Sequence, residues 1–99
     1  MLDTSDILST LKNEKSNLQH QFHINKIGIF GSYARREQMD SSDIDVYVEF
    51  AKGSANFTNV AGLWNYLEEL FHKKIDLVYP NKNANSAALN HIQNEVLYG

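Results

Sequence analysis

Apolar residues near the start of the chain recur at intervals of four or seven positions, with polar residues between them. This spacing keeps them on one face of an α-helix, which turns once in about 3.6 residues. Thr4, Ser5 and Asp6 each carry a side chain that can cap a helix N-terminus. We therefore expect an amphipathic helix over residues 4–22 that packs on a sheet. Its apolar positions are Ile7, Leu11, Leu18 and Phe22.

Strict alternation of apolar and polar residues predicts a strand over residues 43–50. Successive side chains of a strand point to opposite faces of the sheet, so the alternation separates two sets of residues. One face carries Ile44, Val46, Val48 and Phe50. The other face carries Asp43, Asp45, Tyr47 and Glu49.

Two further strands are shorter and mainly apolar. Residues 26–30 form the first of them and end at Gly31, after which residues 33–38 suit one or two turns of helix. Residues 74–79 form the other, and the only proline of the chain, Pro80, closes it.

Two more helices complete the expected order of elements. Thr58 follows a loop at residues 51–56 and is a candidate cap, and Ser86 follows a polar stretch at residues 81–85 and begins the last helix. The apolar positions of the first of these helices are Ala61, Trp64, Leu67, Leu70 and Phe71. Those of the last helix are Leu89, Ile92, Val96 and Leu97.

Composition narrows the class of protein. The 99 residues, of which 42% are apolar and 21% are charged, suit one soluble globular domain over residues 1–99. A net charge of −3 provides no basic surface for binding long DNA or RNA. Without cysteine, disulfides, thiolate zinc sites and cysteine nucleophiles are excluded. We see no signal-peptide core and no run of about 18 apolar residues, and so expect a cytoplasmic protein with no membrane partner.

Acidic residues on two predicted strands form a candidate metal site. Asp43 and Asp45 share one face with α-carbons roughly 6.5 Å apart, and Asp76 interrupts an otherwise apolar strand. If the strands are neighbours, the three carboxylates repel one another unless a cation neutralises them. Hard oxygen ligands favour Mg²⁺ or Mn²⁺. The simpler alternative for Asp43 and Asp45 is a solvent-facing strand whose outward residues are acidic.

The dipeptide Gly31-Ser32 is a candidate phosphate-binding turn. It follows an apolar strand and precedes a short helix, where backbone N–H groups and a hydroxyl are available to phosphate oxygens. Arg35 and Arg36 lie near enough in sequence to add positive charge. The turn lacks the lysine and second glycine of a Walker A loop, and Gly-Ser alone is common in ordinary turns.

The two motifs together resemble the minimal nucleotidyltransferase (MNT) family of the DNA polymerase beta-like superfamily. The resemblance rests on the residues from Gly31 to Arg35, those from Ser42 to Val46, and those from Lys74 to Val78. Ten residues separate Ser32 from Asp43, and the match covers nearly the whole chain. It implies an α+β nucleotidyltransferase fold with a small mixed β-sheet backed by helices, which agrees with the expected order of elements.

The resemblance also implies roles for individual residues. Gly31 and Ser32 would bind the triphosphate, Asp43 and Asp45 would bind both of two metal ions, and Asp76 would bind the ion that activates the nucleophile. The reaction implied is attack of an acceptor hydroxyl on the α-phosphorus of a nucleotide, most simply ATP, with release of pyrophosphate. Two Mg²⁺ or Mn²⁺ ions would be the cofactors.

One position departs from the family pattern. Arg35 falls on a recurrent arginine of the family, whereas Arg36 stands where glycine is common.

The resemblance further implies a partner. Proteins of this kind are typically encoded beside a HEPN-domain protein, as the antitoxin of a HEPN/MNT toxin-antitoxin pair, and transfer AMP to a tyrosine of the HEPN ribonuclease toxin. The short chain carries no acceptor domain of its own, so we expect a partner to complete the site. Two alternatives stay open: a non-catalytic antitoxin that acts by occlusion, and adenylylation of a small molecule together with a partner subunit.

Overall fold

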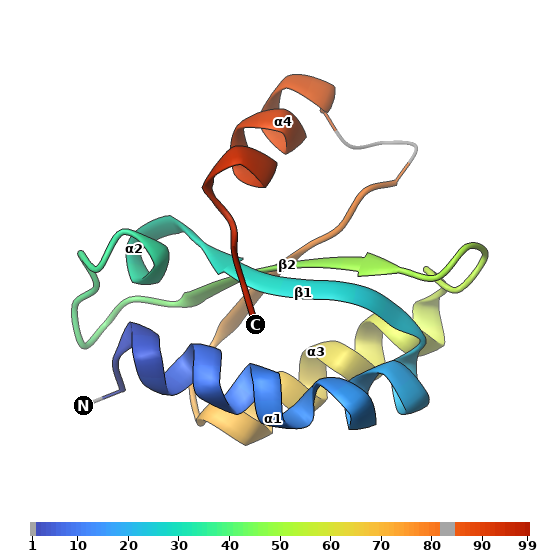
Figure 1. Ribbon diagram of the computed structural model, residues 1–99, viewed down its shortest axis with the longest axis horizontal. Helices are drawn as coiled ribbons and strands as arrows, with labels where there is room; N and C mark the ends of the chain where they lie inside the picture. Colours follow the sequence, from blue (N-terminus) through green and yellow to red (C-terminus); the bar gives the residue numbers. More distant parts are fainter. Residues whose placement is uncertain (1, 82–84) are drawn as a thin grey trace.

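A computed structural model describes residues 2–81 and 85–99 as a mixed four-stranded sheet with helices on both of its faces (Figure 1). The predicted α+β fold is confirmed. In chain order the elements are α1 (Thr4–Phe22), β1 (Ile24–Phe30), α2 (Gly31–Ala34), β2 (Ile44–Phe50), α3 (Phe57–Phe71), β3 (Ile75–Val78), α4 (Ser86–Glu95) and β4 (Leu97–Tyr98).

The strands lie in the order β3-β2-β1-β4. β1 pairs antiparallel with β2 on one side and with β4 on the other, whereas β2 and β3 are parallel. A parallel pair needs a crossover connection, and α3 provides it. In the register of β2 and β3, Asp45 lies directly opposite Asp76.

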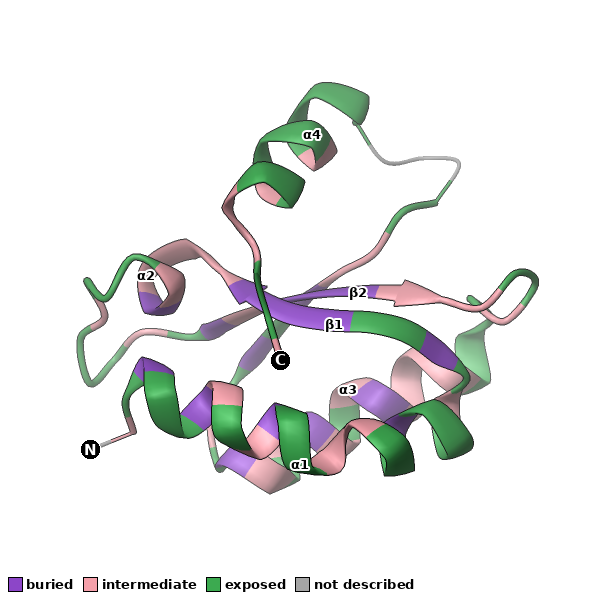
Figure 2. Cartoon of the chain, in the orientation of Figure 1, coloured by how far each residue is buried: buried purple, intermediate pink, exposed green. Residues whose placement is uncertain are grey.

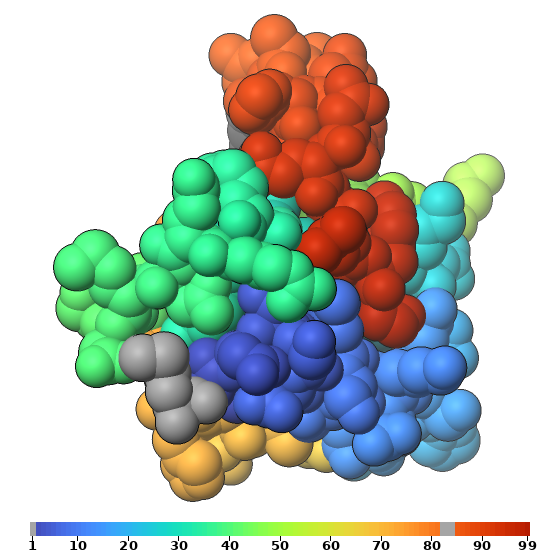
Figure 3. Space-filling model, turned by 60° about the vertical axis from the view of Figure 1, so that its left-hand side comes forward, coloured from blue at the N-terminus to red at the C-terminus, as the bar shows by residue number. Residues whose placement is uncertain are grey.

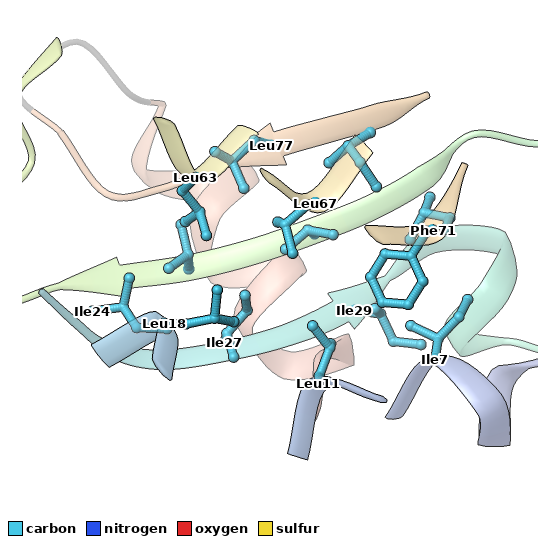
Figure 4. Packing of buried hydrophobic residues seen from close by; sticks show 14 of the residues in the cluster. Ile7, Leu11, Leu18, Ile24, Ile27, Ile29, Leu63, Leu67, Phe71 and Leu77 are labelled. Atoms are coloured by element: carbon cyan, nitrogen blue, oxygen red, sulfur yellow. The ribbon is translucent and has the colours of Figure 1, made fainter. Parts of the chain in front are cut away.

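The apolar core lies between one face of the sheet and the helices α1 and α3 (Figure 4). Ile44, Val46 and Val48 on β2 are fully buried there, which confirms the predicted apolar face of this strand. Ile7, Leu11 and Leu18 of α1 contribute from the helix side. The remaining buried members are Ile24, Ile27, Ile29, Tyr33, Leu63, Leu67, Phe71, Ile75 and Leu77.

Helix caps differ from those predicted. The N-cap of α1 is Asp3, which accepts a hydrogen bond from the backbone N–H of Asp6 while Asp6 accepts one from Asp3. α3 is capped by Asn56 rather than by Thr58. α4 begins at Ser86, as predicted, and Asn85 caps it. Several neighbouring residues are chemically able to cap each helix, and the residue whose backbone stays extended is the one that does so.

The end of the chain also differs from the prediction. The last helix stops at Glu95, and the predicted apolar positions at 96 and 97 lie outside it, where residues 97–98 form β4 beside β1. Gly28 permits this pairing, since a β-carbon there would lie 2.5 Å from the Leu97 carbonyl oxygen. Part of the predicted loop at residues 81–85 lies outside the described residues.

α4 stands over the sheet face opposite the core. All of its residues are described, and none is buried (Figure 2). In Figure 1, α4 lies on the other side of the sheet from α1 and α3. Over residues 2–81 and 85–99, no helix is long and apolar enough to cross a membrane.

Candidate functional site

The turn at the end of β1 is shaped by Gly31. Its φ of +72° lies in the left-handed region, and a β-carbon at this position would collide with the carboxylate of Asp45. Glycine at residue 31 avoids both the strain of this backbone conformation and a collision with the side chain of Asp45. The predicted turn therefore lies against one of the predicted acids, Asp45.

Asp45 and Asp76 lie side by side on the face away from the core. They are direct partners in the parallel register, and neighbouring strands are about 4.8 Å apart. Asp76 is exposed and Asp45 is half-buried. The prediction that these two acids share one face of neighbouring strands is confirmed.

The electrostatic state of Asp45 reflects this arrangement. Burial raises its pKa first, and the negative charges of Asp76 and Asp43 raise it further. The positive charge of Arg35 lowers it in part, and the charge of Glu95 raises it again. A cation bound among these carboxylates would relieve the repulsion.

Asp43 lies just before β2 and is exposed. Its negative charge is near enough to raise the pKa of Asp45. Within the described parts of the chain, however, no group of three His, Asp or Glu side chains is arranged to hold a metal ion. The donor chemistry of the three aspartates suits Mg²⁺ or Mn²⁺. Their side chains would have to converge further to share one ion.

The two predicted arginines differ in their surroundings. Arg35 ends α2 and donates from Nε to Glu37 Oε1 at 2.7 Å and from Nη1 to Glu95 Oε1 at 2.9 Å. Arg36 is exposed and has a left-handed φ of +58°. Across residues 2–81 and 85–99, no hydrogen bond or ion pair involves the Arg36 side chain or the Ser32 hydroxyl.

Glu95, at the end of α4, belongs to the same site. Its Oε1 accepts a hydrogen bond of 2.5 Å from the backbone N–H of Gly31, in addition to the bond from Arg35. The sequence carries no local signal for this contact, because residues 31 and 95 are 64 positions apart. It was absent from the predicted site.

Tyr47 holds α4 to the sheet at a second point. Its buried hydroxyl accepts a hydrogen bond from Gln93 Nε2 at 2.8 Å and donates one to Glu49 Oε2 at 2.7 Å. Burial, as the largest cause, raises the pKa of Tyr47 to about 12. This tyrosine remains protonated at neutral pH.

Comparison with known proteins places this geometry in a family. Residues 12–99 match the family described as "Polymerase beta, Nucleotidyltransferase". The chain therefore belongs to the polymerase beta-type nucleotidyltransferases. It is 34% identical over 98 residues to the protein adenylyltransferase MntA of Thermococcus cleftensis, covering 99% of this chain and 97% of that protein. A relative in Methanocaldococcus jannaschii, also named as a protein adenylyltransferase, is 33% identical over 98 residues. The match covers 99% of this chain and 99% of that protein.

Solved structures share the fold. One named as a minimal nucleotidyltransferase superposes with a TM-score of 0.81 at 24% identity, over 97% of this chain and 95% of that one. Another is the complex of a tri-AMPylated Shewanella oneidensis HEPN toxin with its MNT antitoxin, with a TM-score of 0.62 at 19% identity, over 92% and 70% of the two chains. A toxin-antitoxin crystal structure with AMP-PNP has a TM-score of 0.69 at 22% identity, over 88% and 70%.

Proposed function

We propose that this chain is the antitoxin of a HEPN/MNT pair and silences its partner by transferring AMP from ATP to a tyrosine hydroxyl of that toxin. The observation that carries the proposal is the pairing of Asp45 with Asp76 on the sheet face away from the core, with Asp45 directly against the turn at Gly31. Such a turn suits phosphate oxygens, and paired carboxylates suit divalent cations.

Each residue has a place in the proposed reaction. Asp43 and Asp45 would hold two Mg²⁺ or Mn²⁺ ions, and Asp76 would hold one of them. When bound, such ions neutralise phosphate charge and lower the pKa of an attacking hydroxyl. Asp76 is exposed, which leaves it accessible to an acceptor hydroxyl.

The proposed group transfer forms one bond to the α-phosphorus and breaks another. The tyrosine hydroxyl gives its proton to a carboxylate oxygen of Asp76 as its own oxygen forms a bond to the α-phosphorus. The bond from the α-phosphorus to the bridging oxygen breaks, and pyrophosphate leaves with the electron pair. The Gly31 N–H, the Ser32 hydroxyl and the guanidinium groups of Arg35 and Arg36 would stabilise the pyrophosphate.

The support for a HEPN toxin as the partner comes from similar proteins, in addition to the site of this chain. Two relatives of nearly equal length are named for protein adenylyltransfer, and structures of the same fold are complexes of an MNT antitoxin with a HEPN toxin. The exposure of Asp43 and Asp76 leaves room for a protein acceptor. ATP as donor and a toxin as acceptor together imply a cytoplasmic site of action.

Labelled ATP tests the proposal. The purified chain, its HEPN partner and Mg²⁺ are incubated with ATP labelled at either the α- or the γ-phosphate. Transfer of the α label to the partner, and not of the γ label, is expected. Transfer of the γ label alone would identify a kinase, and tight binding without any transfer would identify an antitoxin that acts by occlusion.

A further inference from the structure

The chain places one of its own carboxylates in the turn proposed for the triphosphate. Glu95 Oε1 lies 2.5 Å from the Gly31 backbone nitrogen and 2.9 Å from Arg35 Nη1. Here a backbone N–H and a guanidinium converge on one anionic oxygen. Both kinds of donor commonly bind phosphate oxygens. The Glu95 side chain is only 21% exposed, so it is held in this position rather than directed to solvent.

A phosphate oxygen and this carboxylate oxygen cannot occupy the same place. The Gly31 N–H is one donor, and Glu95 already accepts its hydrogen. The negative charge of Glu95 would also repel a triphosphate, as it already raises the pKa of Asp45. Both effects oppose nucleotide binding while Glu95 stays in the turn.

The contact is also one of the few that hold α4. None of the residues of this helix is buried, and its end meets α2 where the two segments adjoin in the space-filling view (Figure 3). Gln93 lies two residues before Glu95 on the same helix. Its side chain donates a hydrogen bond to Tyr47, which provides a further polar attachment of α4 to the sheet. Release of Glu95 would therefore detach the end of α4 from the turn at Gly31, while the hydrogen bond from Gln93 to Tyr47 keeps the helix on the sheet.

We propose that Glu95 is an internal competitor of the triphosphate, and that nucleotide binding and the docked position of the end of α4 exclude each other. This inference rests on the proposed function, which assigns the turn at Gly31 to the triphosphate. Because coupling between two sites is reciprocal, a partner that draws α4 away from the turn would raise the affinity for nucleotide by the same factor. The toxin would then promote loading of the site that modifies it.

The test measures binding of AMP-PNP with Mg²⁺ to the purified chain by calorimetry. Glu95→Gln removes the charge at constant size, and Glu95→Ala removes the competing oxygen. Both variants should bind AMP-PNP about tenfold more tightly than the wild type, the factor expected for loss of a charge-assisted hydrogen bond. Circular dichroism and thermal unfolding verify that the variants are folded.

Glu37→Gln is the matched control. Glu37 also pairs with Arg35, at 2.7 Å, but the Gly31 N–H donates to Glu95 and not to Glu37. If the gain in the Glu95 variants came only from freeing Arg35 or from losing a negative charge, Glu37→Gln would reproduce it. We expect this exposed pair to change the affinity by less than about threefold.

Hydrogen exchange of α4 provides a second readout. AMP-PNP should accelerate amide exchange in the peptide spanning residues 86–95 of the wild type, and Glu95→Gln should show the faster exchange without nucleotide. Equal or weaker AMP-PNP binding by both Glu95 variants, or slower exchange in α4 on addition of nucleotide, would overturn this inference alone. Failure of the wild type and of every variant to bind AMP-PNP would overturn the proposed function as well.

Discussion

Gly31 and Asp45 lie so close together that a β-carbon on residue 31 would collide with the Asp45 carboxylate. This contact brings the turn after β1 against the acidic start of β2, so that the turn and the carboxylate form one continuous surface. Any substitution at residue 31 displaces a carboxylate that we propose as a metal ligand.

Gly31→Ala should abolish AMP transfer. The φ of +72° costs an alanine about 1–2 kcal/mol, and the collision forces Asp45 out of its position beside Asp76. Gly53→Ala is the control, because its φ of +78° is similar but no atom lies within 4 Å of the added β-carbon. The control should lose no more stability than Gly31→Ala in urea unfolding and should keep its transfer activity. Full activity of Gly31→Ala would refute the proposed role of the turn.

Asp45→Asn should abolish transfer and, without metal, leave the protein as stable as the wild type or more so. Burial and the charges of Asp76 and Asp43 raise the pKa of Asp45 above its ordinary 3.8, so its ionisation destabilises the folded state. The stability that protonated Asp45 contributes is complete below about pH 3.8 and is lost as the pH rises through the raised pKa. Urea unfolding in EDTA should therefore show the gain of Asp45→Asn at pH 7 shrinking towards pH 4. A variant that unfolds at pH 7 would instead assign Asp45 a structural role.

Metal binding should stabilise the wild type. A cation that binds only the folded chain raises the free energy of unfolding in proportion to the logarithm of its concentration above the dissociation constant. We expect Mg²⁺ or Mn²⁺ to raise the melting temperature of the wild type and to have little effect on Asp45→Asn or Asp76→Asn. A rise of the same size in all three proteins would place the metal elsewhere.

Arg36→Gly should make the protein as stable as before or up to about 1 kcal/mol more stable. The residue has a φ of +58°, which glycine adopts without the steric cost of a side chain. If Arg36 binds the triphosphate, as we predict, the Michaelis constant for ATP should rise while stability is kept. Unchanged kinetics would remove Arg36 from the site and leave Arg35 in it.

Patterns within single segments predict most of the fold and the acidic half of the site. The alternation around Asp45 and the single acid in the strand of Asp76 determine which faces these side chains occupy, and a parallel register then brings them together. Both depend on near neighbours in sequence, which is why they are predictable.

The features that escaped prediction depend on contacts between distant segments. Glu95 meets Gly31 only because β4 returns beside β1, and a two-residue strand leaves almost no pattern in a sequence. Tyr47 was correctly placed on the polar face, yet it is fully buried because Gln93 and α4 cover it. The cap Asp3 lay among several residues of equal chemical suitability.

The intact mass of the HEPN partner, after incubation with this chain, ATP and Mg²⁺, tests the central proposal most directly. We expect one or more added AMP units on a tyrosine with the wild type, and none with Asp45→Asn. An unchanged partner mass in a stable complex with the wild-type chain would contradict it and would make this protein an antitoxin that acts by binding alone.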